Sequence, residues 1–531
     1  MIFDKFSHPA LPAYIIAGII VGNFYPSSQI IEFTQIGILF LVFVFGVKMD
    51  PERLKTIAGD GVKTAAIQMF ILSTASIAAS YMLSLSPFET LIFTLTVSLS
   101  STLVGLDLIE QDLNLELAHG RIAESIHLSQ DMIAVLFLMI VGASTFTPSA
   151  ILQSILLGST LLALSLVFRS YVIDFLSDLT DNSRELMTLL SLSVLIGFLA
   201  LAEYLQLSLA IGAFSAGFAV SKYPHNMEIL DTTGSLKDFF SAIFFVSIGA
   251  LLNTPSLEVI TISALMLGLI ILIKPFTVIG SLVGLGQNKR TAYLTGFSID
   301  QVSELALTIT IQAFLANNIG TTLFQAVIIT ATTSMIISSY TTKHGDKIYD
   351  ILSKYDHIEA FPDQSKGKTP EREMQDHVIV VGYDTQGKTI VEKLREEDEQ
   401  FVVIENDPEK VTDLEEKEEN FVYGDVFEQE TWERSNSQHA QLIISTIPVE
   451  KVSKKILSLK TDADTILRSR SSSEAAELLD EGAVYVNVPD ILSSELLTDH
   501  IQGLMENRQY REELRRKSML ELRRFVEDRE G

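Results

Sequence analysis

Four charged residues interrupt stretches of this chain that are otherwise apolar. Asp131 lies in SIHLSQDMIAVLFLMIV (residues 125–141), Lys274 lies in ILIKPFTVIG, and Glu304 follows Asp300 by one helical turn in FSIDQVSELALTI. At a rise of about 1.5 Å per residue, Asp131, Lys274 and Glu304 fall near the centres of their stretches. A charge at the centre of a membrane costs about 2.5–3.5 kcal/mol, so such residues pair with one another or face a wet cavity. They therefore indicate either a site for protons or ions or a buried ion pair that locks helices together.

Other polar residues gather with these charges. SLSSTLVG supplies Ser100, Ser101 and Thr102, whose hydroxyl and carbonyl oxygens could complete the shell of a cation. Gln130 precedes Asp131 and offers a neutral amide. The set is chemically suited to binding a monovalent cation.

Two further polar residues precede Asp131 on the same helical face. Glu124 and His127 lie seven and four residues before it, a spacing that places side chains one above the other on a helix. Together with Asp300, they could form a proton path toward the cytoplasm. The alternative for His127 is a purely structural hydrogen bond.

A buried carboxylate favours its protonated form, whereas a nearby lysine or a bound cation favours its ionised form. Asp131 can therefore hold a proton or an alkali cation, but hardly both. If only the loaded, neutral forms pass between inward-facing and outward-facing states, the two gradients are coupled. The residues thus predict exchange of K⁺ or Na⁺ for H⁺ by competition at Asp131.

A polytopic, all-α membrane domain is predicted to position these residues. Since a span needs about 20 apolar residues, we expect twelve, at 9–26, 31–48, 62–85, 88–110, 120–145, 150–172, 184–205, 208–222, 237–253, 256–285, 291–316 and 321–342. With a cytoplasmic N-terminus, the outward loops hold no Lys or Arg, as the positive-inside rule requires. The inward loops hold Lys48, Arg53, Lys55, Lys63, Arg121, Arg169, Arg184, Lys222, Lys237, Lys289 and Arg290. We therefore expect a multi-pass protein of the cell membrane whose C-terminal part is cytoplasmic.

The composition excludes several classes of function. Of the net charge of −27, the part from His344 onward contributes −18, with 25 Lys and Arg against 43 Asp and Glu. Such acidity argues against binding nucleic acid or anionic lipid, and it is typical of either a halophile-like surface or a simple acidic tail. The chain has no cysteine, which excludes disulfides, thiolate zinc sites and cysteine nucleophiles.

An ordered set of motifs resembles the monovalent cation:proton antiporter-2 family, which includes glutathione-gated potassium efflux systems and sodium–proton exchangers. The motifs are PALPAYIIAGIIVG, TQIGILFLVFVFGVKMDPERL, SLSSTLVGL, GRIAESIHLSQD, LSLAIGAFSAGF, IFFVSIGALL and DQVSELAL. The resemblance implies an inverted-repeat fold with crossed, discontinuous helices and Asp131 as the ion- and proton-binding acid. The single acid after Gln130 implies electroneutral, one-for-one exchange.

The resemblance also assigns the neighbouring residues. Lys274 matches the family's basic residue, and Ser100, Ser101 and Thr102 match its unwound crossing helix. Gln301, Ser303 and Glu304 match its glutamine–serine–glutamate run. The chain departs from the family where Asp300 and Val302 replace frequent glycines and where Glu124, His127 and Ser129 replace apolar residues, which implies an altered proton path or ion choice. The family also usually has one more helix ahead of the first span predicted here.

The rest of the chain is predicted as a linker (344–375), a Rossmann-like domain (376–502) and a charged C-terminal helix (503–531). HVIVVGYDTQGKTIVEKL indicates a strand, a glycine turn and a helix, and further strand–helix units follow it. Such alternation predicts a right-handed, doubly wound parallel sheet.

The glycine turn predicts a nucleotide site of altered chemistry. It runs from Gly382 to Gly387, but Asp384 replaces the glycine that normally lets backbone approach a pyrophosphate. Glu405 follows Gly382 by 23 residues, a spacing suited to a ribose hydroxyl. A nucleotide site and a Rossmann-like domain that has lost its ligand both stay open.

VVGYDTQGKTI, VIENDPEKV and FVYGDVF resemble the RCK domain, a regulator of potassium transport. That resemblance implies a homodimer and a regulatory ligand, NAD(H) or an adenine nucleotide. It would be held by Gly382, Asp384, Gly387, Glu405, Asp407, Gly424 and Asp425.

The leading hypothesis is a regulated monovalent cation:proton antiporter rather than an enzyme. An RCK-gated potassium channel would need a carbonyl filter such as TVGYG, and residues 1–343 contain none. A membrane-anchored NAD-dependent oxidoreductase would need a substrate domain and groups for hydride transfer, which the C-terminal sequence does not indicate.

Overall fold

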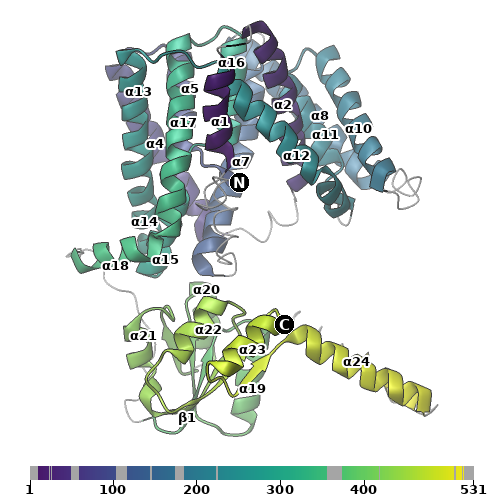
Figure 1. Cartoon of the computed structure of the whole chain (residues 1–531), viewed down its shortest axis with the longest axis vertical. Coiled ribbons are helices and arrows are strands. Elements are labelled where there is room, and N and C mark those ends of the chain that lie inside the picture. Colours follow the sequence, from purple (N-terminus) through teal and green to yellow (C-terminus); the bar gives the residue numbers. More distant parts are fainter. Residues whose placement is uncertain are drawn as a thin grey trace. The chain divides into compact units, whose positions relative to one another are not determined.

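The computed structural model describes residues 10–22, 24, 27–49, 59–102, 117–143, 146–173, 184–222, 225–355, 374–417, 419–506, 510–512, 514–516 and 518–519. The chain divides into two compact units, Met1–Pro362 and Asp363–Gly531. The first unit is helical and the second contains a sheet flanked by helices (Figure 1). This division agrees with the predicted combination of an all-α part and an α/β part.

Helices occupy all twelve stretches that were predicted as spans. In chain order they are α1 (Ala10–Val21), α2 (Ser27–Lys48), α4 (Asp60–Met82), α5 (Pro87–Ser98), α7 (Ala118–Val141), α8 (Pro148–Val167) with the π-helical turn η3 (Phe168–Val172), α10 (Arg184–Tyr204), α11 (Leu209–Ala219), α12 (His225–Ala250), α13 (Leu257–Gly268), the π-helical turn η4 (Leu269–Ile273), α14 (Lys274–Gly284), α15 (Lys289–Ser298), α16 (Glu304–Leu315) and α17 (Thr321–Lys343). Residues 9, 23, 25–26, 103–110 and 144–145 of the predicted spans lie outside the described residues.

Length and composition confirm a membrane protein but not the number of spans. Among the described residues, seven helical stretches are long and apolar enough to cross a bilayer: Gln29–Lys48, Asp60–Met82, Ala118–Val141, Pro148–Val172, Glu185–Tyr204, Leu257–Gly284 and Thr321–Lys343. Three shorter apolar helices are Pro12–Val21, Leu209–Ala219 and Glu304–Leu315. The twelve spans therefore stay a prediction, partly because helices that break inside the unit are too short to qualify alone.

Glycines allow pairs of helices in the first unit to approach to backbone contact. A Cβ added at Gly217 of α11 would lie 2.0 Å from the carbonyl oxygen of Phe43 in α2. A Cβ at Gly249 of α12 would lie 2.0 Å from the carbonyl oxygen of Ile15 in α1. Between apolar helices in lipid, such close van der Waals packing through small residues replaces the hydrophobic effect.

The predicted linker (344–375) begins with a helix. Helix α18 (Gly345–Tyr355) belongs to the first unit. Its Tyr349 packs on Tyr293 of α15 with the ring centroids 5.5 Å apart. A short amphipathic helix has too many polar residues to stand out beside long apolar spans, so the sequence did not predict it. Residues 356–373 of the predicted linker lie outside the described residues.

The second unit contains the predicted doubly wound sheet. Its six strands are all parallel and lie in the order β3-β2-β1-β4-β5-β6. They are β1 (His377–Val381), β2 (Phe401–Glu405), β3 (Phe421–Tyr423), β4 (Ala440–Ser445), β5 (Asp464–Arg468) and β6 (Tyr485–Asn487). The strand order reverses between β1 and β4, and ligands of such sheets bind at the carboxyl ends of the strands at that point.

The helices of the second unit are α19 (Thr385–Glu396), α20 (Pro408–Glu416), α21 (Gln429–Arg434), η5 (Ser437–His439), α22 (Glu450–Leu457), α23 (Ser472–Asp480) and α24 (Pro489–Glu506). Helix α24 leaves the sheet as a long, separate element (Figure 1). It runs through the boundary predicted at 502/503, so the charged C-terminal segment follows directly on a helix that begins in the Rossmann-like part.

Replacing Gly217 by Ala should destabilise the protein, because the added methyl group meets the backbone of α2 and cannot be relieved by a side-chain rotation. We expect a loss of about 1–3 kcal/mol, as for other overpacked interiors. The matched control is Gly197→Ala in α10, where nothing lies within 4 Å of the added Cβ. Thermal unfolding of the purified protein in detergent measures both variants, and equal melting temperatures would contradict the close crossing.

Candidate functional site

Two helices of the first unit break and contact each other where they break. Helices α5 and α15 both end, and non-helical backbone follows each of them. The hydroxyl of Ser100 donates to the carbonyl of Ile299 at 3.0 Å, and the amide of Gln301 donates to the carbonyl of Ser101 at 3.1 Å. Backbone groups inside a membrane must be paired within the protein. Each broken segment therefore supplies partners for the other, as the expected crossing of discontinuous helices requires.

Lys274 holds this crossing together. Its buried Nζ donates to the carbonyl of Leu99 at 3.0 Å and to the carbonyl of Gln301 at 3.2 Å, one from each broken segment. A cation at the C-terminal end of α5 also suits the helix dipole. Lys274 interacts electrostatically with Asp300, but among the described residues it forms no ion pair with Asp131. Its charged amino group therefore satisfies backbone carbonyl groups rather than neutralising Asp131, the acid predicted to bind the ion.

Two acids lie close together beside the crossing. The hydroxyl of Thr102 donates to Oδ2 of buried Asp131 at 2.6 Å. The hydroxyl of Ser101 donates to Oε1 of buried Glu304, which begins α16. The charge of Glu304 acts on Asp131, so the two carboxylates share one electrostatic environment. Carboxylate, hydroxyl and carbonyl oxygens are the groups that replace the hydration shell of an alkali cation.

Gln130, unlike its neighbour Asp131, hydrogen-bonds to the backbone of the broken segment after α5. Its Oε1 accepts from the backbone N–H of Ser100 at 2.7 Å, and its Nε2 donates to Oε1 of Gln68 at 2.6 Å. Gln68 in turn donates to the carbonyl of Ser98 at 3.0 Å. The sequence analysis missed Gln68, although an amide inside the apolar stretch of α4 was a visible signal. Together the two amides tie α4 and α7 to the end of α5.

The residues of the predicted proton path differ in burial and in hydrogen bonding. His127 is fully buried, and neither ring nitrogen has a hydrogen-bond partner among the described residues. It interacts electrostatically with Lys274. Asp300 is also buried; its Oδ2 accepts from the hydroxyl of Thr341 at 2.7 Å, whereas its Oδ1 accepts no hydrogen bond among the described residues. Glu124 lies on α7, as His127 does, and is half-buried. The geometry thus gathers His127 and Asp300 around Lys274.

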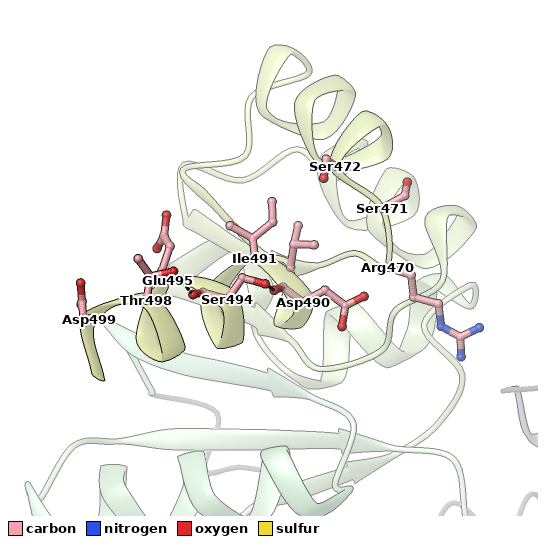
Figure 2. Close-up of a pocket in the computed structure, with 10 residues that line it drawn as sticks. Arg470, Ser471, Ser472, Asp490, Ile491, Ser494, Glu495, Thr498 and Asp499 are labelled. Carbon is pink, nitrogen blue, oxygen red and sulfur yellow. Dashed lines mark hydrogen bonds between the residues drawn. The ribbon is translucent and has the colours of Figure 1, made fainter. Parts of the chain in front are cut away.

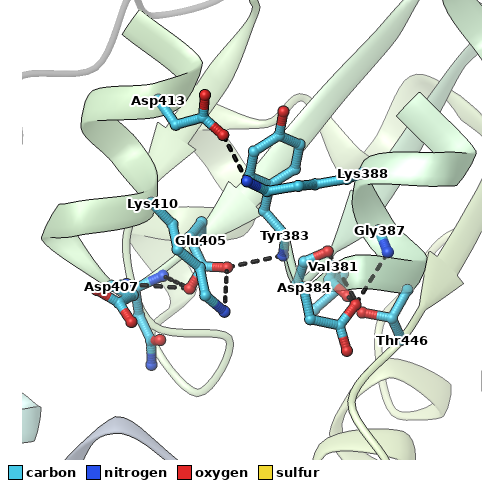
Figure 3. A network of polar contacts seen from close by, with 12 residues as sticks. Val381, Tyr383, Asp384, Gly387, Lys388, Glu405, Asp407, Lys410, Asp413 and Thr446 are labelled. Carbon is cyan, nitrogen blue, oxygen red and sulfur yellow. Dashed lines mark hydrogen bonds and ion pairs between the residues drawn. The ribbon is translucent and has the colours of Figure 1, made fainter. Parts of the chain in front are cut away.

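The glycine turn of the second unit has the backbone that a nucleotide site needs at its first and last glycines. Gly382 has φ +94°, a conformation that favours glycine. A Cβ at Gly387 would lie 2.1 Å from the carbonyl oxygen of Gly382. Between them, Asp384 caps α19: its Oδ1 accepts from the N–H of Gly387 at 2.9 Å (Figure 3). Helix N-termini bind phosphate, so this carboxylate lies where a phosphate would.

Glu405 lies at the carboxyl end of β2, next to the glycine turn. Its buried carboxylate accepts from the backbone N–H groups of Tyr383 at 2.7 Å, Asn406 at 2.9 Å and Asp407 at 3.0 Å, and Lys410 lies 3.6 Å away (Figure 3). The predicted ribose acid is therefore positioned at the switch point, but it also organises its own turn.

The turn after β3 and an ion pair between α19 and α20 lie in the same region. At the next strand, a Cβ at Gly424 would lie 2.4 Å from Oγ1 of Thr431, and Asp425 accepts from the N–H of Phe427 at 2.9 Å, so both residues shape the turn after β3. Lys388 in α19 lies 2.7 Å from Asp413 in α20 (Figure 3). Burial opposes the ionised form of Asp413, but hydrogen bonds from Lys388 and Lys417 outweigh it, and the pKa of Asp413 falls below its ordinary value.

Two hollows open on the second unit. One, of about 590 Å³, is lined by Asp384, Thr385, Gln386, Thr389, Ile390 and Arg468, and so shares Asp384, but no other predicted residue, with the predicted nucleotide site. Its volume lies in the range of about 300–1,000 Å³ of ligand pockets. The other, of about 950 Å³, lies between the turn at Arg470–Ser472 and the first turns of α24 (Figure 2). It contains none of the predicted site residues.

The comparison with known sequences agrees with this architecture. Crossed, broken helices around buried charges are typical of secondary ion transporters. Residues 1–344 match the family described as "Sodium/hydrogen exchanger, transmembrane", and residues 378–489 match the TrkA-N domain. Since the first match covers well over half of the chain, this protein belongs to the sodium/hydrogen exchanger family and carries a C-terminal TrkA-N domain. The resemblance to an exchanger with an RCK-type domain is confirmed.

Several relatives share this arrangement along most of their length. The chain is 25% identical over 514 residues to YbaL of Escherichia coli (strain K12), provisionally named a cation/proton antiporter, and the match covers 91% of each chain. It is 25% identical over 455 residues to the glutathione-regulated potassium-efflux system protein KefC of Enterobacter sp. (strain 638), covering 82% of this chain and 70% of KefC. The solved TrkA-N domain of E. coli YbaL is 26% identical and matches 24% of this chain and 97% of that domain, with a TM-score of 0.23.

Replacing Lys274 by Met should lower stability, because it removes two charge-assisted hydrogen bonds and leaves the carbonyls of Leu99 and Gln301 without this donor. Hydrogen bonds to charged groups contribute about 1.5–3 kcal/mol each. The control Lys343→Met removes an exposed lysine at the end of α17, and we expect a change within about 0.5 kcal/mol. Thermal unfolding in detergent distinguishes them. A Lys274→Met protein that melts with the wild type would show that the crossing does not depend on this lysine.

Proposed function

We propose that this protein is a secondary antiporter that exchanges a monovalent cation, K⁺ or Na⁺, for H⁺ and is regulated by its C-terminal domain. The observation that carries the proposal is the pair of buried carboxylates, Asp131 and Glu304, each bonded to a hydroxyl from the same broken segment. A buried acid pair of this kind binds either cations or protons. The names of the relatives, as cation/proton antiporters and potassium-efflux proteins, agree with it.

Exchange follows from competition at Asp131. With a cation bound, the carboxylates of Asp131 and Glu304 and the oxygens of Ser101 and Thr102 supply the ligands. With a proton on Asp131, the carboxyl group is neutral and the hydroxyl of Thr102 remains its partner. Because only one acid of the pair changes its occupant, one cation is exchanged for one proton, which makes the cycle electroneutral.

Three residues position the site without being cation ligands in this proposal: Lys274, Gln130 and Gln301. They bind the backbone of the broken segments, so they orient Ser101, Thr102 and Glu304 toward Asp131. Glu124, His127 and Asp300 form the route by which protons reach Asp131 from the cytoplasmic side. His127, with its unpartnered ring nitrogens, is the central member of this route.

The proposed setting is the cell membrane, crossed by twelve spans, with the C-terminal unit in the cytoplasm and the protein acting as a homodimer. Lys and Arg on one side of the predicted spans support this orientation. The match to the sodium/hydrogen exchanger family supports a transporter rather than an enzyme.

The TrkA-N domain is proposed to bind NAD(H) or an adenine nucleotide as a regulatory ligand. Glu405 fits the ribose of such a ligand, and Gly382 and Gly387 form the glycine turn beside it. Asp407, Gly424 and Asp425 shape the neighbouring turns. Asp384 does not fit a phosphate. A ligand here alters transport only if it binds the inward-facing and outward-facing states with different affinity.

Replacing Asp131 by Asn should abolish exchange, because an amide can hold neither a transferable proton nor a cation charge. The purified protein is reconstituted into liposomes with an internal pH dye, and KCl, NaCl and LiCl are added in turn. The control Asp238→Asn removes an exposed acid of α12 and should exchange as the wild type does. A cation-dependent pH change that survives in Asp131→Asn would exclude the mechanism.

Replacing His127 by Gln should lower the maximal exchange rate while leaving the apparent affinity for the cation unchanged. Glutamine can hydrogen-bond but cannot relay a proton, and positioned proton-transfer groups contribute about 10²-fold or more. The same liposome assay, at several pH values and saturating cation, measures the rate. The matched variant His127→Leu can neither form hydrogen bonds through its side chain nor relay a proton. Full activity of His127→Gln together with failure of His127→Leu would assign His127 a structural hydrogen-bonding role only.

A further inference from the structure

The phosphate end of the nucleotide-type site already contains an anion that belongs to the protein. Oδ1 of Asp384 accepts from the N–H of Gly387 at 2.9 Å, inside the first turn of α19. Oδ2 of the same carboxylate lies 3.6 Å from Nη1 of Arg468. One oxygen thus uses the helix N-terminus and the other faces a guanidinium, which are the two groups that a bound phosphate would use.

The surroundings of Asp384 would otherwise suit an anion. The hollow of about 590 Å³ beside it is lined by Thr385, Gln386 and Thr389 as well as Arg468. Arg468 also donates to the carbonyl of Thr446 at 3.1 Å, which fixes its guanidinium at this end of the hollow. Among the described residues that line the hollow, Asp384 is the one acid. The acid is therefore the single feature that opposes a second negative charge.

The ribose end of the site is built without such a conflict. Glu405 is held by three backbone N–H groups at the end of β2, and Gly382 and Gly387 keep the turn close to the strand. The two ends of the site therefore differ. The nucleoside end can accept a ribose, whereas at the phosphate end the negative charge of Asp384 repels a phosphate.

We propose that Asp384 is a built-in substitute for the ligand phosphate and determines which ligands the TrkA-N domain accepts. The proposal deepens the regulatory role given above and rests on it. The site favours the uncharged nucleoside part, and phosphate-bearing nucleotides are bound weakly, because Asp384 must leave the N-terminus of α19 before a phosphate can lie there. Once Asp384 has left, Arg468 is free to pair with the phosphate.

The test is a binding measurement with the full-length protein in detergent at constant salt. Adenosine, AMP and NADH are titrated calorimetrically into the wild type and into Asp384→Asn. The substitution keeps an oxygen that can cap α19, since asparagine is a good N-cap residue, but it removes the charge. We expect AMP and NADH to bind at least about tenfold more tightly to the variant, the change that a gain of about 1.4 kcal/mol produces. Adenosine should bind equally to both proteins.

Two further variants make the outcome decisive. Asp384→Gly restores the glycine usual at this position and should show the same gain, even if Asp384→Asn folds poorly. The matched control, Asp398→Asn, removes an exposed acid just beyond the opposite end of α19 and should bind all three probes as the wild type does. Adding Arg468→Gln to Asp384→Asn should cancel the gain for AMP.

The proposal is overturned if folded Asp384→Asn and Asp384→Gly bind AMP and NADH no more tightly than the wild type does. It is equally overturned if the wild type binds AMP more tightly than adenosine, or if none of the folded proteins binds any probe. Because ligand binding is measured rather than transport, these results are independent of whether Asp131 carries out exchange.

Discussion

The first unit depends on pairing the backbone groups that two broken helices expose. A helix that stops inside a membrane leaves carbonyl and N–H groups that no water can satisfy. Here Lys274 takes one carbonyl from each segment, Gln130 takes the N–H of Ser100, and Gln301 takes the carbonyl of Ser101. These bonds are what allow extended backbone, and with it a cluster of hydroxyls, to exist inside an apolar unit.

This pairing divides the polar residues into two groups with different tasks. The amides and the lysine are engaged with backbone, so they are fixed. The acids Asp131 and Glu304 are bonded mainly through hydroxyls, which can rotate and exchange one partner for another. A rigid frame with adaptable acids is what competition between a proton and a cation requires, because the occupant can change without breaking the crossing.

The sequence revealed the polar residues inside apolar stretches better than it predicted their hydrogen-bond partners. A charge such as Lys274 within an apolar stretch is visible from composition, but its hydrogen bonds to Leu99 and Gln301 join positions 175 and 27 residues away, and spacing along the chain carries no information about them. Gln68 was missed for the same reason. The parallel sheet was predicted because its signals are local: a strand is followed by its own turn and helix. The short strand β6 was not among the strands predicted. Helix α18 was not predicted, because an amphipathic helix within a polar segment resembles a linker in composition.

The same physical rule links the two units of the chain. In the first unit, lysine and glutamine side chains satisfy backbone ends that would otherwise need a ligand or water. In the second unit, Asp384 caps α19 and Glu405 binds three N–H groups, so the ends of α19 and β2 are satisfied without a nucleotide. A regulatory domain built in this way has a stable resting state of its own. On the proposal above, a ligand would have to replace these internal bonds rather than fill unsatisfied ones, and its effect would depend on the difference in free energy between the two bonded arrangements.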